Sequence, residues 1–268
     1  MPAGGTGLVL RGLRKEPATI GKWHLGWDLT YKEGKAKTVD NIDFTKRVAN
    51  GPTDRGFDYF YGLTSPSGPP HLYMVNDMAE KQPNTRFEES GGGLYKIKGG
   101  IGHSDWSADG MQPHLADKML EYLDENKDSD KPFFLYMALT APHIPLFPSK
   151  EFKGKSKIGD YGDLVMMIDD IVGRVNRKLK EIGKYDNTIV MFAADNGCAG
   201  YINMDRINRK GHYPSYIYRG YKSHGWEGGH RIPFILSWGD RYGHVTDNSL
   251  VSLTDLYATF ADMLGYRI

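Results

Sequence analysis

Short apolar runs alternate along this chain with longer stretches of helical periodicity. The four runs are 18–23, 133–139, 188–194 and 233–238, and turn-prone or polar residues bound each of them. Runs of this length that are apolar on both faces are typical of strands inside a sheet that helices cover. Strands that alternate with helices predict an α/β fold with a largely parallel sheet flanked by helices.

Three segments carry helical periodicity. In residues 161–182 the apolar side chains recur every three or four positions, which places them on one stripe of a helix. The stripe consists of Leu164, Ile168, Ile171, Val175, Leu179 and Ile182. Residues 114–122 predict a shorter helix, and residues 249–264 predict a third. The segment 48–110 is rich in glycine and proline without sustained periodicity, and it predicts long loops laid over the sheet.

Length and charge narrow the class of protein. The 268 residues predict one large domain over 1–268. Lysine and arginine number 34 against 33 aspartates and glutamates, and this net charge of +1 argues against a nucleic-acid partner, which requires a basic excess.

The longest apolar stretch, 132–147, is interrupted by prolines and is shorter than the roughly 20 residues of a membrane span, so no membrane partner is predicted. The single cysteine, Cys198, excludes an intramolecular disulfide framework.

Polar residues follow three of the predicted strands. Lys22 and His24 come at the end of the first, His143 follows the second, and Asp195 and Asn196 follow the third. Ligands of open α/β sheets bind beyond the carboxyl ends of the strands, so we expect these side chains at one edge. A carboxylate beside an amide oxygen suits a hard cation such as calcium or magnesium. A lysine and a histidine two residues apart on an extended segment point the same way and suit an anion.

Each feature also has a structural interpretation. Asn196-Gly197 is a turn signal, and a single histidine such as His143 is more often packed than catalytic. The segment 222–231, KSHGWEGGHR, suits an anion through Lys222, but it is also typical of a solvated loop that uses its glycines to turn. Cys198 is typical of a small packed residue rather than a nucleophile. The sequence contains no G-x-S-x-G elbow and no complete phosphate loop.

Taken together, these segments resemble the sulfatases of the alkaline-phosphatase superfamily. The resemblance extends from about residue 20 to residue 264. It rests on GKWHLG at 21–26, APH at 141–143, DNG at 195–197, and Lys222 followed by WEGG at 226–229. The segments GPTDRGFDYFYG at 51–62 and KGHYPSYIYR at 210–219 are similar to bacterial arylsulfatases.

The resemblance implies a sulfuric ester hydrolase of the arylsulfatase type, with an alkaline-phosphatase-like fold. The implied catalytic residues are Lys22, His24 and His143, the substrate contacts are Lys222 and His212, and the ligands of one calcium ion are Asp195 and Asn196. The implied substrate is a sulfated small molecule or carbohydrate. The family's intact members are often periplasmic or secreted, and no signal peptide is visible in this sequence.

The sequence departs from the family at the nucleophile. Members carry C/S-x-P/A-x-R, in which the Cys or Ser is converted to formylglycine. Cys198 is followed by AGYI, and in SGPPH at 67–71 a histidine stands where the arginine is required. The family's early Asp-Asp calcium pair is absent too. We therefore expect a partial catalytic domain, incomplete at the N-terminus and lacking the C-terminal subdomain, that is inactive by itself.

Two other functions stay open. One is a related phosphoester or phosphonate hydrolase, and the other is a non-catalytic remnant that binds sulfated ligands. The GKWHLG segment and the K-x-x-x-W-E-G-G spacing favour a sulfatase over the first, whereas the missing nucleophile supports the second. The sulfatase interpretation requires a single electropositive cleft, which six side chains line: Lys22, His24, His143, Asp195, Asn196 and Lys222.

Overall fold

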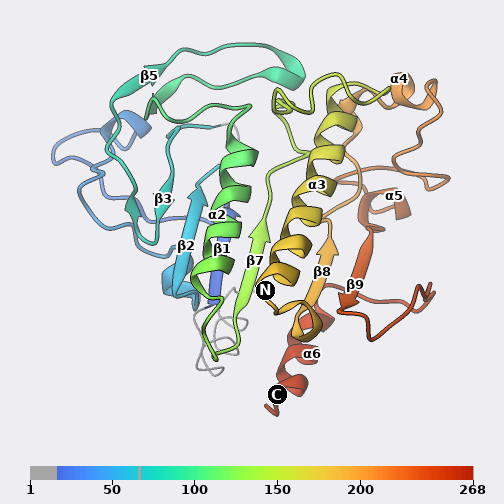
Figure 1. Cartoon of the computed structure of the whole chain (residues 1–268). Coiled ribbons are helices and arrows are strands. Elements are labelled where there is room, and N and C mark those ends of the chain that lie inside the picture. The colour runs from blue at the N-terminus through green and yellow to red at the C-terminus, as the bar shows by residue number, and fades with distance from the viewer. Residues whose placement is uncertain (1–16, 66–67, 268) are drawn as a thin grey trace. The chain divides into compact units, whose positions relative to one another are not determined.

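The computed structural model describes residues 17–65 and 68–267 (Figure 1). The chain divides into two compact units. The first contains the chain up to Gly91, Lys96–Thr140 and the chain from Thr246 onward, and the second contains Gly92–Tyr95 and Ala141–Val245. None of the helices in the described residues has both the length and the apolar character that a membrane span needs.

A five-stranded sheet of order β4-β3-β2-β1-β7 forms the first unit. The strand β1 (Pro17–Lys22) lies between β2 (Tyr59–Leu63) and β7 (Phe134–Ala138) and pairs in parallel with both. The register sets Gly21 opposite both Gly62 and Ala138, so the carboxyl ends of the three strands meet at one edge. Lys22, the last residue of β1, therefore lies at the edge where ligands of such sheets bind.

Shorter strands extend this unit. β3 (Met74–Val75) and β4 (Met78–Ala79) continue the sheet in antiparallel pairing, and β5 (Thr85–Phe87) pairs with β6 (Gly100–Gly102) as a separate hairpin. The prediction of loops over 48–110 is therefore wrong for β2 through β6. The sequence pattern does not distinguish the run YFYGL of β2 from the other aromatic residues around it. The run forms a strand because it pairs with β1.

Two helices of the first unit contribute to its packing. α2 (Met111–Glu125) contacts β1 and β2, and its Leu115, Met119 and Tyr122 are buried as the periodicity predicts. α6 (Asp255–Met263) brings the ring of Phe260 to 6.0 Å from that of Phe134 in β7. The third predicted helix thus begins later than residue 249. Leu253, expected on its inner face, precedes the helix and is 40% exposed.

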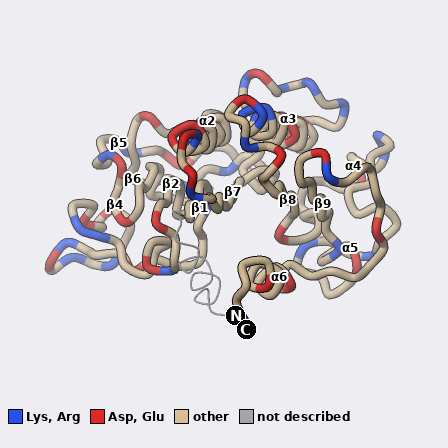
Figure 2. Tube along the Cα trace, turned by 60° about the horizontal axis from the view of Figure 1, so that its bottom comes forward, with Lys and Arg blue, Asp and Glu red and all other residues tan. Residues whose placement is uncertain are grey.

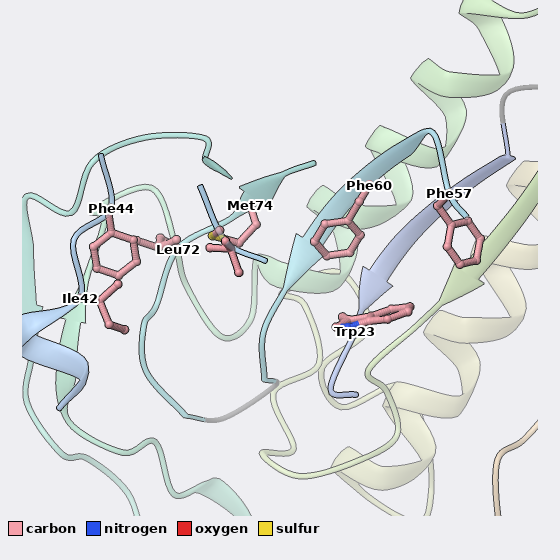
Figure 3. Packing of buried hydrophobic residues seen from close by; sticks show 8 residues of the cluster. Trp23, Ile42, Phe44, Phe57, Phe60, Leu72 and Met74 are labelled. Atoms are coloured by element: carbon pink, nitrogen blue, oxygen red, sulfur yellow. The ribbon is translucent and has the colours of Figure 1, made fainter. Parts of the chain in front are cut away.

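A cluster of buried apolar side chains fills the first unit beside β1 and β2. It includes Trp23, Ile42, Phe44, Phe57, Phe60, Leu72 and Met74 (Figure 3). The ring of Trp23 meets the ring of Phe57 edge-on, with 6.3 Å between the centroids. Trp23 stands between Lys22 and His24 in the sequence, so its burial fixes the backbone that carries both.

The second unit pairs a long helix with a two-stranded sheet. α3 (Asp160–Glu181) buries Leu164, Ile168, Ile171, Val175 and Leu179, which confirms the predicted stripe except for Ile182, which follows the helix and is half-buried. Two aspartates in its first turn and two lysines in its last complement the helix dipole. β8 (Ile189–Ala193) pairs antiparallel with β9 (Phe234–Trp238), whereas the largely parallel expectation holds for β1, β2 and β7.

The remaining elements of the second unit are single turns and short helices. They are η3 (Gly93–Tyr95), η4 (Tyr185–Asn187), η5 (Gly200–Ile202), α4 (Met204–Asn208) and α5 (Glu227–His230). The first unit also contains η1 (Val39–Asn41) and η2 (Pro52–Arg55). β7, β8 and β9 are half-buried or exposed rather than buried on both faces, because β7 ends its sheet and β8 and β9 have only each other as partners.

Candidate functional site

The end of β1 holds Lys22 and His24 at the surface of the first unit. The backbone N–H of Trp23 donates to the carbonyl oxygen of Leu63 at 3.1 Å, and its indole N–H donates to the carbonyl oxygen of Gly26, also at 3.1 Å. Lys22 is half-buried, and His24 is exposed with a φ of 48°. The backbone thus turns sharply at His24. Lys22 and His24 flank the buried Trp23, as an alternating pattern predicts. The extended segment, however, ends with β1 at Lys22.

In the second unit, two loops that are distant in the sequence are hydrogen-bonded to each other. The first carries Asp195 and Asn196 after β8, and the second runs from Arg219 to α5. The N–H of Gly197 donates to the carbonyl oxygen of Gly229 at 2.9 Å. The N–H of Lys222 donates to the carbonyl oxygen of Cys198 at 2.8 Å. These bonds place the backbone of Lys222 beside the Asp195-Asn196 turn.

This close approach requires glycine at two positions. A Cβ on Gly197 would overlap the carbonyl oxygen of Gly228, and a Cβ on Gly228 would overlap that of Gly220. Both contacts are with backbone atoms, which cannot move aside as a flexible side chain would. Gly197 therefore serves the packing between the two loops, and Gly228 lets the second loop fold back closely on itself. Lys222 is half-buried between them, and its ammonium group has no ion-pair partner among the described residues.

His143 lies beside Tyr201 in the second unit. Its Nδ1 is 2.7 Å from the carbonyl oxygen of Ile144. Since a carbonyl oxygen only accepts, Nδ1 carries the proton, and Nε2 is the basic nitrogen of the neutral ring. The ring of Tyr201 stands edge-on to the His143 ring, with 6.1 Å between centroids. His143 is half-buried, so it is not a core histidine.

Tyr201 connects His143 to the turn after β8. Burial raises the pKa of Tyr201, and the nearby groups Cys198 and Asp195 raise it further, while a backbone hydrogen bond with Ile144 lowers it. Tyr201 follows the Asp195-Asn196 turn in the sequence, within η5. Its ring contact with His143 therefore brings His143 to the segment just beyond that turn. Tyr201 was missed in the sequence, where it is one of many tyrosines and lies outside every motif.

Cys198 is a packed residue. Burial raises the pKa of its thiol, and a hydrogen bond shared with the Tyr161 hydroxyl at 3.5 Å partly offsets that shift. A raised pKa leaves little thiolate at neutral pH, and the thiolate is the reactive form. This environment agrees with the interpretation of Cys198 as a small packed residue. It contains no group that lowers the thiol pKa below its ordinary value, as a nucleophile would require.

Asp195 and Asn196 offer part of the donor set that calcium prefers. Asp195 is exposed and Asn196 is half-buried, and both supply side-chain oxygens. Calcium takes about six to eight oxygen ligands. Within residues 17–65 and 68–267, no three His, Cys, Asp or Glu side chains gather in a way that could hold a metal ion. These two residues alone do not complete a calcium site.

Four of the predicted site residues lie in the second unit, on segments that backbone hydrogen bonds and the contact of His143 with Tyr201 connect: His143, Asp195, Asn196 and Lys222. His212 lies in the same unit, exposed, on the loop after α4. Lys22 and His24 belong to the first unit, so the convergence of all six stays a prediction. Ser67, the closest match to the family nucleophile, lies outside the described residues. His71 of the same motif is buried, with its Nε2 at 2.7 Å from the carbonyl oxygen of Lys98.

Comparison with known proteins agrees with the resemblance. The family model described as Sulfatase matches residues 9–266. An N-acetylgalactosamine-6-O-sulfatase of Bacteroides thetaiotaomicron is 29% identical over 91% of this chain and 53% of its own length. An arylsulfatase of Hemicentrotus pulcherrimus is 30% identical over 92% of this chain and 40% of its own. The chain therefore spans about half the length of the curated relatives it matches.

The fold agrees as well. A solved structure from work on glycosaminoglycan metabolism in Bacteroides thetaiotaomicron superimposes with a TM-score of 0.80 and is 26% identical. The match covers 98% of this chain and 60% of that one. The α/β architecture with a mixed, largely parallel sheet is thus the alkaline-phosphatase-like fold that the sequence predicts.

Proposed function

The chain belongs to the sulfatase family, and from that premise we propose that it carries the sulfate-binding and proton-transfer part of a catalytic domain that hydrolyses a sulfate ester. One observation carries this proposal. Backbone hydrogen bonds from Gly197 and Lys222 join the segment that carries Asp195 and Asn196 to the loop that carries Lys222 and WEGG. This connection between two distant motifs supports a shared site that combines a lysine with a carboxylate and an amide.

The lysines and histidines have distinct roles in this proposal. Lys222 neutralises the sulfate oxygens from the second unit, and Lys22 does so from the end of β1. His143 has Nδ1 occupied by a backbone carbonyl, so its Nε2 exchanges a proton with the substrate. His24 is exposed just beyond β1 and is proposed as a second proton-transfer group. His212 is proposed to contact the substrate from the loop after α4.

We propose calcium as the ion that Asp195 and Asn196 help to hold in the complete site. Bound there, it would stabilise negative charge on the sulfate group. Two oxygen donors leave most of the shell to other ligands, so calcium binding by these 268 residues is expected to be weak. The sequence contains no C/S-x-P/A-x-R, and the chain by itself is therefore proposed to bind substrate without turning it over.

The proposed substrate is a sulfated carbohydrate. The relative from Bacteroides thetaiotaomicron is named for N-acetylgalactosamine 6-sulfate, and this is the compound we choose as a probe. A periplasmic or secreted location, where sulfated glycans occur, would suit that substrate.

The test is a calorimetric titration of the chain with N-acetylgalactosamine 6-sulfate. The chain is expected to bind the sulfated sugar and not N-acetylgalactosamine itself. Lys222→Ala should weaken binding about tenfold, because it removes a half-buried cation from the anion. Lys131→Ala, which removes an exposed lysine of the first unit, is the matched control and should leave binding unchanged.

Two results would contradict the proposal. Equal affinity of the Lys222→Ala variant and the parent chain would remove Lys222 from the site. Tighter binding of N-acetylgalactosamine 6-phosphate than of the sulfate would favour a phosphoester hydrolase instead.

A further inference from the structure

Two neighbouring segments of the second unit concentrate positive charge. Residues 150–157 and 205–210 are called the basic surface here. They contain seven cations against the two carboxylates of Glu151 and Asp205, a net charge of +5 in a chain whose total is +1. The cations are Lys150, Lys153, Lys155, Lys157, Arg206, Arg209 and Lys210, and all seven are exposed. Figure 2 marks the lysines and arginines along the chain.

The first of these segments is held in one conformation. The carboxylate of Asp163, in the first turn of α3, is fully buried and accepts the N–H of Gly154 at 2.7 Å and of Ser156 at 2.6 Å. Phe152 is buried as a second anchor. The lysines between these anchors are therefore presented on an ordered backbone, which reduces the entropy lost when a partner binds.

The second segment lies directly against the first. The ammonium group of Lys210 donates to the carbonyl oxygen of Lys157 at 2.6 Å. This bond satisfies one N–H without neutralising the charge, because the acceptor is a backbone carbonyl. α4 is fixed by the side chain of Asn203, which accepts the N–H of Arg206 at 3.2 Å, and by the buried Ile207. Both segments thus form one continuous cationic surface.

The cations of the basic surface have no acidic partners. Other lysines of the chain, such as Lys118 and Lys178, form ion pairs with glutamates of their own helices at 2.8 Å. None of the seven cations makes an ion pair within the described part of the chain. Like charges held together repel one another, and an anionic partner relieves that repulsion.

We propose that the basic surface binds a sulfated polysaccharide, holding the polymer by sulfate groups other than the one that reacts. The choice of polyanion rests on the function proposed above, in which the reacting group is a sulfate ester on a sugar. A polymer of such sugars repeats its sulfates along the chain, so one ordered group of cations meets several of them at once. Multiple contacts raise the effective concentration of the substrate at the enzyme.

The test uses dextran sulfate as the polyanion and neutral dextran as its control. The full chain should bind dextran sulfate, with an affinity that falls as salt rises, and should not bind dextran. A variant with Lys153→Ala, Lys155→Ala and Lys157→Ala should bind dextran sulfate about tenfold more weakly, since it loses three exposed cation–anion contacts.

The chain offers a matched control. Lys32, Lys35 and Lys37 are three exposed lysines that also lie within a few residues of one another, in the first unit, but residues 28–43 also contain four carboxylates. Their triple alanine variant changes the net charge by the same amount. It should retain most of the affinity for dextran sulfate. Equal losses in the two triple variants would mean that only net charge matters and would overturn the proposal.

Two further measurements separate this proposal from the function itself. The triple alanine variant of Lys153, Lys155 and Lys157 should bind N-acetylgalactosamine 6-sulfate as tightly as the parent chain. A single sugar is expected to occupy the reactive site without touching the basic surface. If it loses the monosaccharide too, the basic surface is part of the reactive site and the proposal is wrong. If the parent chain binds the polymer but not the monosaccharide, the proposed function fails while the basic surface stands. Equally tight binding of double-stranded DNA would overturn the assignment to a sulfated polysaccharide.

Discussion

The N–H of Lys222 donates a hydrogen bond of 2.8 Å to the carbonyl oxygen of Cys198. This single bond joins the loop of the proposed sulfate-binding lysine to the turn that carries Asp195 and Asn196. At Cys198 the backbone carbonyl makes this connection, while the half-buried thiol lies near the hydroxyl of Tyr161.

Gly228→Ala is expected to destabilise the second unit. The added Cβ would overlap the carbonyl oxygen of Gly220 and crowd that of Arg219, so the loop from Arg219 to α5 would have to open. We expect the free energy of unfolding to fall by about 1–3 kcal/mol in urea denaturation. Gly225→Ala is the control, because a Cβ there meets no atom within 4 Å. Equal free energies of unfolding in the two variants would show that the close approach of Gly228 to Gly220 is not needed for stability, which would contradict this prediction.

Stability should decrease in mild acid because of His114. Burial lowers the pKa of His114 below its ordinary value of 6.5, and its Nε2 lies 2.6 Å from the hydroxyl of Tyr61. A proton therefore binds the unfolded chain more readily, and the free energy of unfolding falls as pH drops through 6.5 toward the folded-state pKa. His71 acts in the same direction, because burial lowers its pKa as well.

His114→Gln keeps a hydrogen-bonding group for Tyr61 but cannot titrate. Thermal unfolding between pH 7 and 5 is expected to show a shallower decline for this variant than for the parent chain. His244→Gln, at an exposed position, should follow the parent. An unchanged decline in His114→Gln would assign the acid sensitivity to other groups.

Cys198 should react slowly with iodoacetamide in the folded chain. Its raised pKa and its burial both limit the thiolate that reacts. Tyr161→Phe should slow the reaction further, since the hydrogen bond from Tyr161 lowers the thiol pKa. In denaturant, the parent chain and the Tyr161→Phe variant should react at equal rates, both faster than in the folded state. A faster reaction in folded Tyr161→Phe would mean that this tyrosine shields the thiol rather than activating it.

Calcium is expected to bind the 268-residue chain weakly, with a dissociation constant of about 10⁻⁴ M or above, because Asp195 and Asn196 supply only part of its shell. Asp195→Asn should abolish the binding measured by calorimetry, whereas Asp205→Asn, which changes an exposed carboxylate on α4, should not. Sub-micromolar affinity in the parent chain would show that other groups complete the site.

The same chain should not hydrolyse a chromogenic aryl sulfate, with or without calcium, because no Cys or Ser stands in the sequence that formylglycine formation requires. Release of the chromophore would be followed over hours. Turnover that survives purification and disappears in Cys198→Ala would instead identify Cys198 as a nucleophile.

Local pattern was sufficient for much of the secondary structure. The stripe of α3 needed only the spacing of its apolar residues, since a helix buries one face whatever it packs against. The runs that became β1, β7, β8 and β9 were recognisable because each is short, continuously apolar and bounded by turn-prone or polar residues, and a buried helix would be longer. GKWHLG, DNG and WEGG pointed to the family because each sets charged or polar side chains beside a glycine at a turn or a close approach.

The tertiary structure decided what depends on a partner distant in the sequence. β2 became a strand by pairing with β1, and β8 pairs antiparallel with β9, which lies far from it in the sequence. The contact of Tyr201 with His143 and the packing of Gly197 on Gly228 join residues tens of positions apart. Sequence periodicity describes which face a residue takes within its own element. Periodicity does not identify the element on the other side of a contact, and it is such a contact that joins the backbone of Lys222 to that of Cys198.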